Sequence, residues 1–215
     1  MSRPPIEDLD RVGAAERRLE AAASTLDDAQ LRGPSLLPGW SVAHVLAHVA
    51  RNADSHVRRA LAAARGEIVE QYAGGREGRE REIERTSRAS ATDLRRDVHE
   101  SARHLDETWR ATPDGAWDMV TRDVGGRERP LRDLPGRRWQ ELEVHLVDID
   151  VGPTHEDWTD DFVRVFLPRL RAGMPARLSP GVSAPDTHGL GERQELAWLY
   201  GRLAPEGLPM LTPWS

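Results

Sequence analysis

The sequence has 215 residues, a formal net charge of -6 and no cysteine. This length suits one ordinary domain, or one domain with a small appendage, and the lack of cysteine excludes disulfides, cysteine-rich zinc sites and a cysteine nucleophile. Basic residues are interleaved with acidic ones, and no apolar run reaches the ~18 residues of a membrane span, so we expect a soluble, cytoplasmic protein that binds neither nucleic acid nor membrane.

The N-terminal region reads as one helix followed by a loop. Apolar residues recur at helical spacing from about Ile6 to Asp28, after the Pro4-Pro5 pair that favours a helix start. The Gly33-Pro34 and Pro38-Gly39 pairs then break the helical pattern. We therefore predict a first helix over 6–28 and a loop up to residue 40.

A second helix follows, and it carries a polar edge. Ser41 is placed to cap it, and we expect it to run to about Arg65, with Gly66 as its terminator. Its apolar stripe predicts a face in the core. Beside that stripe, at helical spacing, lie His44, His48 and Asn52.

The middle of the chain is predicted to hold a loop, a long helix and an irregular stretch. The loop is Gln71–Arg76, where two adjacent glycines indicate a tight turn. A single, highly charged helix is expected from Glu77 to about Arg110. Pro113–Pro135 looks irregular, with a short extended piece at Val120–Arg122.

A fourth helix, from about Leu134 or Gly136 to Asp150, carries the most informative spacing in the chain. Glu141 and His145 are four residues apart, so they lie on one helical face, and Asp148 continues the same edge. A carboxylate and an imidazole so placed can bind one metal ion, but catalytic zinc usually takes three protein ligands. The third would come from the polar edge of the second helix, as in bundle metal sites.

Spacing alone leaves other interpretations open. Spacing alone favours, for the Glu141 and His145 pair, a solvated helix edge with an i,i+4 hydrogen bond. Either His44 or His48 fits a histidine that is simply satisfied beside the core. A zinc site is therefore one of several possibilities at this point.

The chain changes character after Gly152-Pro153, which is the predicted domain boundary. We expect residues 1–152 to form a four-helix bundle and residues 153–215 a small α+β C-terminal domain, so that the protein is mainly α. Within the second part, 158–171 and 193–203 look helical. Pro175–Thr187 holds three prolines and reads as loop or short strands.

Several motifs taken together resemble one known family. They are, in order, Pro38-Gly39-Trp40-Ser41 leading into His44-Val45-Leu46-Ala47-His48, then Tyr72 and Arg79, then Trp139-Gln140-Glu141 with His145, and finally Trp198-Leu199-Tyr200-Gly201-Arg202. This ordered set resembles the mycothiol-dependent maleylpyruvate isomerase family over nearly the whole chain. The resemblance implies a DinB-like metal-binding four-helix bundle followed by a small C-terminal domain.

The resemblance also implies a ligand set and cofactors. Zn²⁺ would be held by His48, Glu141 and His145, and the thiol would be mycothiol, since the chain has none of its own. Arg79 and Arg202 would bind substrate carboxylates, with Arg76 or Arg81 as alternatives to Arg79 if the loop register differs. Hydrogen bonds to the ligand would come from Tyr72 or Asn52.

The implied reaction is the cis-trans isomerisation of maleylpyruvate to fumarylpyruvate by reversible addition of a thiolate. The partners would be a small carboxylate substrate and a low-molecular-weight thiol, and the protein would be a monomer or weak homodimer. One alternative is a mycothiol S-transferase acting on another electrophile. A second is a zinc-binding or thiol-binding module without turnover.

Overall fold

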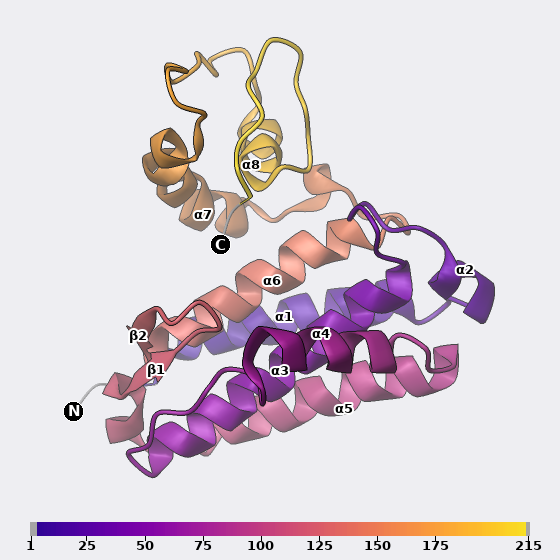
Figure 1. Ribbon diagram of the computed structural model, residues 1–215, viewed down its shortest axis with the longest axis vertical. Helices are drawn as coiled ribbons and strands as arrows, with labels where there is room; N and C mark the ends of the chain where they lie inside the picture. The colour runs from indigo at the N-terminus through magenta and orange to yellow at the C-terminus, as the bar shows by residue number, and fades with distance from the viewer. Residues whose placement is uncertain (1–3, 214–215) are drawn as a thin grey trace. The chain divides into compact units, whose positions relative to one another are not determined.

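The computed structural model describes residues 4–213. The chain divides into two compact units, residues 1–151 and 152–215, and each is considered by itself. The first unit contains most of the helices and a two-stranded sheet (Figure 1). Its elements are α1 (Ile6–Ala23), α2 (Asp28–Arg32), α3 (Val42–Ala64), α4 (Gly75–Thr86), α5 (Ala91–Arg110), β1 (Val120–Arg122), β2 (Glu128–Pro130) and α6 (Leu134–Asp148).

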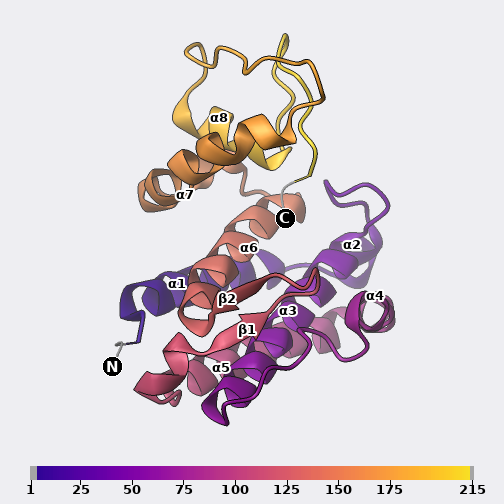
Figure 2. The ribbon, with the colours of Figure 1, turned by 60° about the vertical axis from the view of Figure 1, so that its left-hand side comes forward.

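Four of these helices form a bundle. Helix α3 packs against α5 and α6, and α1 packs against the same two helices, so the four close a ring around one core (Figures 1 and 2). The short helix α4 covers α3 from outside the ring. The core is built from the apolar stripes of all four helices, including Leu9, Leu19, Leu46, Leu94, Leu105 and Leu142. The mainly helical class with a four-helix bundle is confirmed.

The start and end of α3 follow the local sequence signals. The hydroxyl of Ser41 accepts a hydrogen bond from the backbone N–H of His44, and Nδ1 of His44 accepts one from the backbone N–H of Ser41. This reciprocal pair satisfies two donors at the helix start. Gly66, with φ at 73°, follows the last turn, where a left-handed conformation favours glycine. Both predicted ends of this helix are confirmed.

The single long helix predicted from Glu77 to Arg110 is wrong, because the chain breaks into α4 and α5. Ser90 caps α5 by accepting a hydrogen bond from the backbone N–H of Asp93 at 3.1 Å. The Arg32 side chain donates to the carbonyls of Ser87, Arg88 and Ala89, which the helix end leaves without intrahelical partners. A distant arginine thus stabilises the break.

The first helix also ends earlier than expected, at Ala23. Asp27 starts a separate short helix, α2, through a capping box with Gln30. The extended piece predicted at Val120–Arg122 is confirmed as β1, which pairs antiparallel with β2 in the register Val120 to Pro130. Gly126, with φ at 84°, lies in the turn between the two strands.

A buried arginine on α6 connects three helices. Arg138 donates two hydrogen bonds to Oε1 of Glu16 on α1, at 2.9 and 2.7 Å. Its Nη1 donates to the carbonyl of Val49 and to Oδ1 of Asn52 on α3, at 2.8 and 2.9 Å. These bonds fix the rotation of α6, so that the face carrying Glu141 is held against α3.

The second unit contains α7 (Asp160–Gly173) and α8 (Glu192–Tyr200), which pack against each other. Trp158, Phe162 and Tyr200 form an aromatic cluster between them, with ring centroids 5.4–6.1 Å apart. The strands expected in this unit are absent from residues 152–213, and both strands of the described chain lie in the first unit. Pro175, Pro180 and Pro185 explain this, since they cannot donate to a strand ladder.

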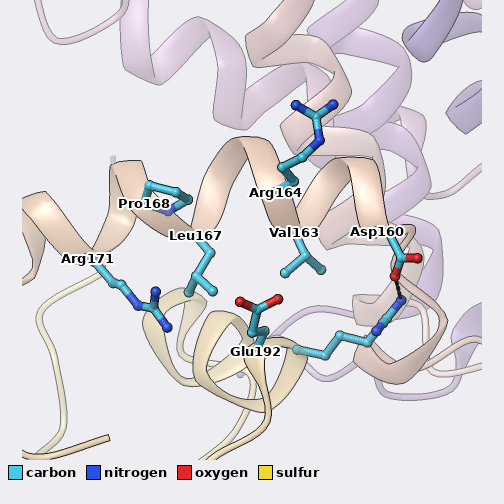
Figure 3. A pocket seen from close by; sticks show the side chains of 8 residues that line it. Asp160, Val163, Arg164, Leu167, Pro168, Arg171 and Glu192 are labelled. Atoms are coloured by element: carbon cyan, nitrogen blue, oxygen red, sulfur yellow. Dashed lines mark hydrogen bonds and ion pairs between the residues drawn. The ribbon is translucent and has the colours of Figure 1, made fainter. Parts of the chain in front are cut away.

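A pocket of about 370 Å³ lies along α7 and α8 in the second unit (Figure 3). Its arginines are already paired with acids, because Arg171 binds Glu195 and Arg193 binds Asp160. The charges of this pocket are therefore largely compensated within the unit. No helix in residues 4–213 is both long and apolar enough to cross a membrane.

Candidate metal centre

Three potential ligands meet between α3 and α6. His48 lies on α3, while Glu141 and His145 lie one turn apart on α6. Oε2 of Glu141 is 3.1 Å from Nε2 of His48 and 3.3 Å from Nε2 of His145. The three ligand atoms all lie within 4.8 Å of one another. The two imidazole rings are nearly perpendicular, at 89°, with centroids 4.8 Å apart.

This donor set suits zinc. Two imidazole nitrogens and one carboxylate oxygen are common ligands of catalytic zinc, which keeps a further position open. Zinc–ligand bonds of about 2.0–2.2 Å in a tetrahedron place ligand atoms about 3.3–3.6 Å apart. The observed separations from Glu141, 3.1 and 3.3 Å, are close to that spacing. Two of the three ligand separations are therefore already close to those around one small divalent ion.

The protonation of two of these groups also suits a metal ligand. Burial lowers the pKa of His48 to about 4, so its imidazole is neutral near pH 7. Burial alone would raise the pKa of Glu141, but hydrogen bonds from His145 and His48 outweigh it and hold this pKa well below the usual range. Glu141 is thus in the form that binds a metal, and a metal on Nε2 of His48 would displace the proton that this nitrogen shares with Glu141.

His145 is oriented by a carboxylate behind it. Its Nδ1 lies 2.8 Å from Oδ2 of Asp148, which is completely buried. Burial would lower the pKa of His145, but the hydrogen bonds to Asp148 and Glu141 raise it. A carboxylate in this position fixes the tautomer of a ligating histidine and increases its basicity. Helical spacing predicted that Asp148 lies on the same edge as Glu141 and His145, but no function was predicted for it.

Aromatic rings and one arginine surround His48. The ring of Trp40 lies 5.7 Å from that of His48, and Nη2 of Arg79 donates to Nδ1 of His48 at 3.1 Å. The Arg79 guanidinium also lies 5.8 Å from the Trp40 ring and 5.9 Å from the ring of Tyr72, within the range of cation–π attraction. The predicted site residues Arg79 and Tyr72 thus lie beside the three candidate ligands, and so does Trp40, for which no site role was predicted.

Other candidate residues lie elsewhere. Nε2 of His44 is 3.1 Å from Glu84, so this side chain turns away from the cluster. Oδ1 of Asn52 accepts from Arg138, which leaves only its amide N–H groups for a ligand. Arg76 and Arg81 are exposed on α4. Arg202 belongs to the second unit, where it follows α8 and its Nη1 donates to the carbonyl of Tyr200 at 2.7 Å.

Comparison with known proteins gives one family and one fold. Residues 12–150 match the family described as the mycothiol maleylpyruvate isomerase N-terminal domain. A crystal structure of the mycothiol-dependent maleylpyruvate isomerase is similar to this chain with a TM-score of 0.85, 24% sequence identity and full coverage of both chains. A histidine-to-alanine mutant of that enzyme gives a TM-score of 0.86 at 22% identity, also with full coverage of both chains. No curated protein sequence matches.

Proposed function

The chain belongs to the family of the mycothiol maleylpyruvate isomerase N-terminal domain, and from this premise we propose that it isomerises maleylpyruvate to fumarylpyruvate with zinc and mycothiol. The observation that carries the proposal is the convergence of His48, Glu141 and His145 from two helices. A metal-stabilised thiolate is the nucleophile that this reaction needs. Because the chain has no cysteine, the thiol is supplied by the cofactor.

Zinc bound by these three residues would stabilise the thiolate of mycothiol near neutral pH. The chain's own groups prepare this state. His48 is held neutral by burial, and Asp148 keeps the proton of His145 on Nδ1, so that Nε2 faces Glu141. With zinc bound, two neutral imidazoles and one carboxylate would leave net positive charge for an anionic sulfur.

The reaction is balanced without any oxidant or reductant. The thiolate adds to one carbon of the cis double bond, and the electron pair of that bond moves into the conjugated carbonyl to give an enolate. The former double bond is now single and rotates. The enolate then expels the thiolate and leaves the trans double bond, so mycothiol is regenerated.

Arg79 is the residue of the first unit best placed to serve the substrate near His48. Its guanidinium forms no ion pair with a carboxylate in residues 4–213, so the donors not used by His48 are available for a substrate carboxylate or for the developing enolate. Tyr72 lies beside it and can add a hydrogen bond. Arg202, to which the family resemblance assigns a further carboxylate contact, lies in the second unit, and that role stays a prediction.

The test is conversion of maleylpyruvate by zinc-loaded protein, followed with and without mycothiol. The proposal predicts conversion that requires both zinc and the thiol. If zinc-loaded protein consumes mycothiol stoichiometrically in a reaction with other electrophiles and leaves maleylpyruvate unchanged, the protein is an S-transferase and the isomerase assignment is wrong.

A further inference from the structure

Two polar stripes face each other along α3 and α6. On α3, His48, Asn52, Ser55 and Arg59 recur at helical spacing, and on α6 the corresponding residues are His145, Glu141 and Arg137. The two helices pack against each other and run in opposite directions (Figure 1). The metal cluster is therefore at one end of the paired stripes, and the two arginines, Arg59 and Arg137, are toward the other end.

Neither of these two arginines forms a direct ion pair within residues 4–213. The side chain of Arg59 is buried, with 3% of the residue exposed, and it donates to the carbonyl of Ser55 and to Nδ1 of His56, each at 3.2 Å. Arg137 is half-buried, and within residues 4–213 it forms neither an ion pair nor a hydrogen bond. A guanidinium removed from water without a carboxylate in direct contact is costly, which distinguishes these residues from Arg138 with its ion pair to Glu16.

The β1–β2 hairpin adds a third cation to the same region. Gln71 joins the hairpin to α3, since its Oε1 accepts from the backbone N–H of Val124 at 2.9 Å and its Nε2 donates to the hydroxyl of Ser55 at 3.4 Å. Arg129 of β2 forms an ion pair with Asp123 at 2.7 Å. Its side chain is largely buried, with 11% exposed.

The charges of the three guanidinium groups act on one another. Burial lowers the pKa of Arg59 to about 10, and the charges of Arg129 and Arg137 act in the same direction. Burial also lowers the pKa of Arg137, together with the nearby charge of Arg129. The charge of Asp123 acts on both Arg59 and Arg137, and that of Glu141 acts on Arg137, so three cations face two carboxylates in this region.

We propose that Arg137, supported by Arg59 and Arg129, binds the substrate carboxylate that is remote from the metal ligands. This inference rests on the proposed function and assigns a specificity-determining residue to it. Arg137 precedes Glu141 by one helical turn, about 6 Å along the axis. With Arg79 at the His48 end, the first unit then offers a guanidinium at each end of a dicarboxylate, and each can bind a carboxylate through two parallel hydrogen bonds.

The experiment measures binding by calorimetry on zinc-loaded protein, with adipate and hexanoate as probes of equal length that differ by one carboxylate. We expect wild type to prefer adipate by at least tenfold, about 1.4 kcal/mol. Arg137→Ala should abolish the preference, and so should Arg137→Gln, which keeps most of the side chain and removes the charge. Arg17→Ala removes an exposed arginine of α1 and is the matched control, which should retain the preference.

Zinc content and the helical circular dichroism of each variant are measured in parallel, and both should equal those of wild type. The inference is overturned if wild type shows no preference, or if both Arg137 variants keep it. Its failure is separable from failure of the proposed function. If the protein isomerises maleylpyruvate with mycothiol but the Arg137 variants keep the adipate preference, the inference alone is refuted. If the preference depends on Arg137 but no isomerisation occurs, the inference is supported and the proposed reaction is refuted.

Discussion

Nδ1 of His145 lies 2.8 Å from Oδ2 of Asp148, a hydrogen bond between two buried groups one turn apart on α6. The carboxylate holds the imidazole so that its other nitrogen faces Glu141 and His48. A ligand whose orientation is fixed in advance loses less freedom when the metal binds. Asp148 is therefore expected to act on the metal without touching it.

Replacing Asp148 by asparagine should lower zinc affinity by about 10–100-fold, because the amide keeps the shape of the side chain but loses the charge that makes His145 more basic. Competition with a chromophoric chelator measures the change. Asp150→Asn is the control, since Asp150 is exposed beyond the end of α6. Equal zinc affinities of Asp148→Asn and wild type would refute this role.

Removal of any single ligand should remove the metal and the activity. His48→Ala, Glu141→Ala and His145→Ala each leave two protein ligands, too few for a tight catalytic site. The apolar stripes of the bundle are unchanged in these variants, so cooperative unfolding should persist. His44→Ala is the matched control on α3, because that side chain contacts Glu84 instead. A ligand variant with full zinc occupancy and full turnover would show that the assignment of that residue is wrong.

Arg79→Ala should lower kcat/KM for maleylpyruvate by about 100-fold, the typical cost of removing one donor to a developing oxyanion. Zinc content should stay at the wild-type level, because Arg79 contacts the Nδ1 side of His48 and supplies no metal ligand. Arg76→Ala removes an exposed arginine of the same helix and should leave the rate unchanged. If Arg76→Ala lowered kcat/KM more than Arg79→Ala, the assignment of Arg79 as the arginine that faces the site would be wrong.

Arg138→Ala should destabilise the first unit by about 3–5 kcal/mol, because it leaves the Glu16 carboxylate buried without its cation. The free energy of unfolding in urea measures the change. Arg110→Ala breaks an exposed ion pair with Asp106 on α5 and should cost less than about 1 kcal/mol. The double variant Glu16→Leu with Arg138→Met should recover most of the loss; a double variant as unstable as Arg138→Ala would contradict the ion-pair explanation.

His56 should make the protein sensitive to acid. Burial lowers its pKa well below the ordinary value, and nearby Arg59 adds to the effect. Between that lowered pKa and about pH 6.5, the unfolded chain binds a proton that the folded chain does not, so stability falls as the pH decreases through this window. The slope contributed by one such group is up to about 1.4 kcal/mol per pH unit.

His56→Gln should therefore flatten the dependence of unfolding free energy on pH between 6.5 and 5, measured by urea titrations in metal-free protein. His99→Gln, which removes an exposed imidazole from α5, is the control. A His56→Gln variant whose pH dependence matches that of wild type would show that another group is responsible.

Local sequence signals predicted α3 and α6 well because their ends are set by nearby residues. Ser41 and Gly66 bound α3 through contacts within the first and last turns. The break between α4 and α5 was missed because a main partner of the exposed carbonyls is Arg32, more than fifty residues away in the chain. Contacts of that kind leave no periodic signal in the sequence.

The same distinction holds at the candidate site. The four-residue spacing of Glu141 and His145 marks them as a pair, and the family resemblance adds His48 from another helix. The support given by Asp148 and the unpaired charge of Arg137 depend on which groups lie nearby after folding. The sequence does not distinguish a half-buried, unpaired arginine from a solvated one, so this distinction requires the structure.

Elemental analysis of zinc in the purified wild-type chain tests the central claim most directly. The account predicts one zinc per chain, since His48, Glu141 and His145 form one three-ligand cluster with their ligand atoms within 4.8 Å of one another. Protein that contains no zinc, and that fails to take up zinc on reconstitution at neutral pH, would contradict the metal centre and the thiolate chemistry built on it.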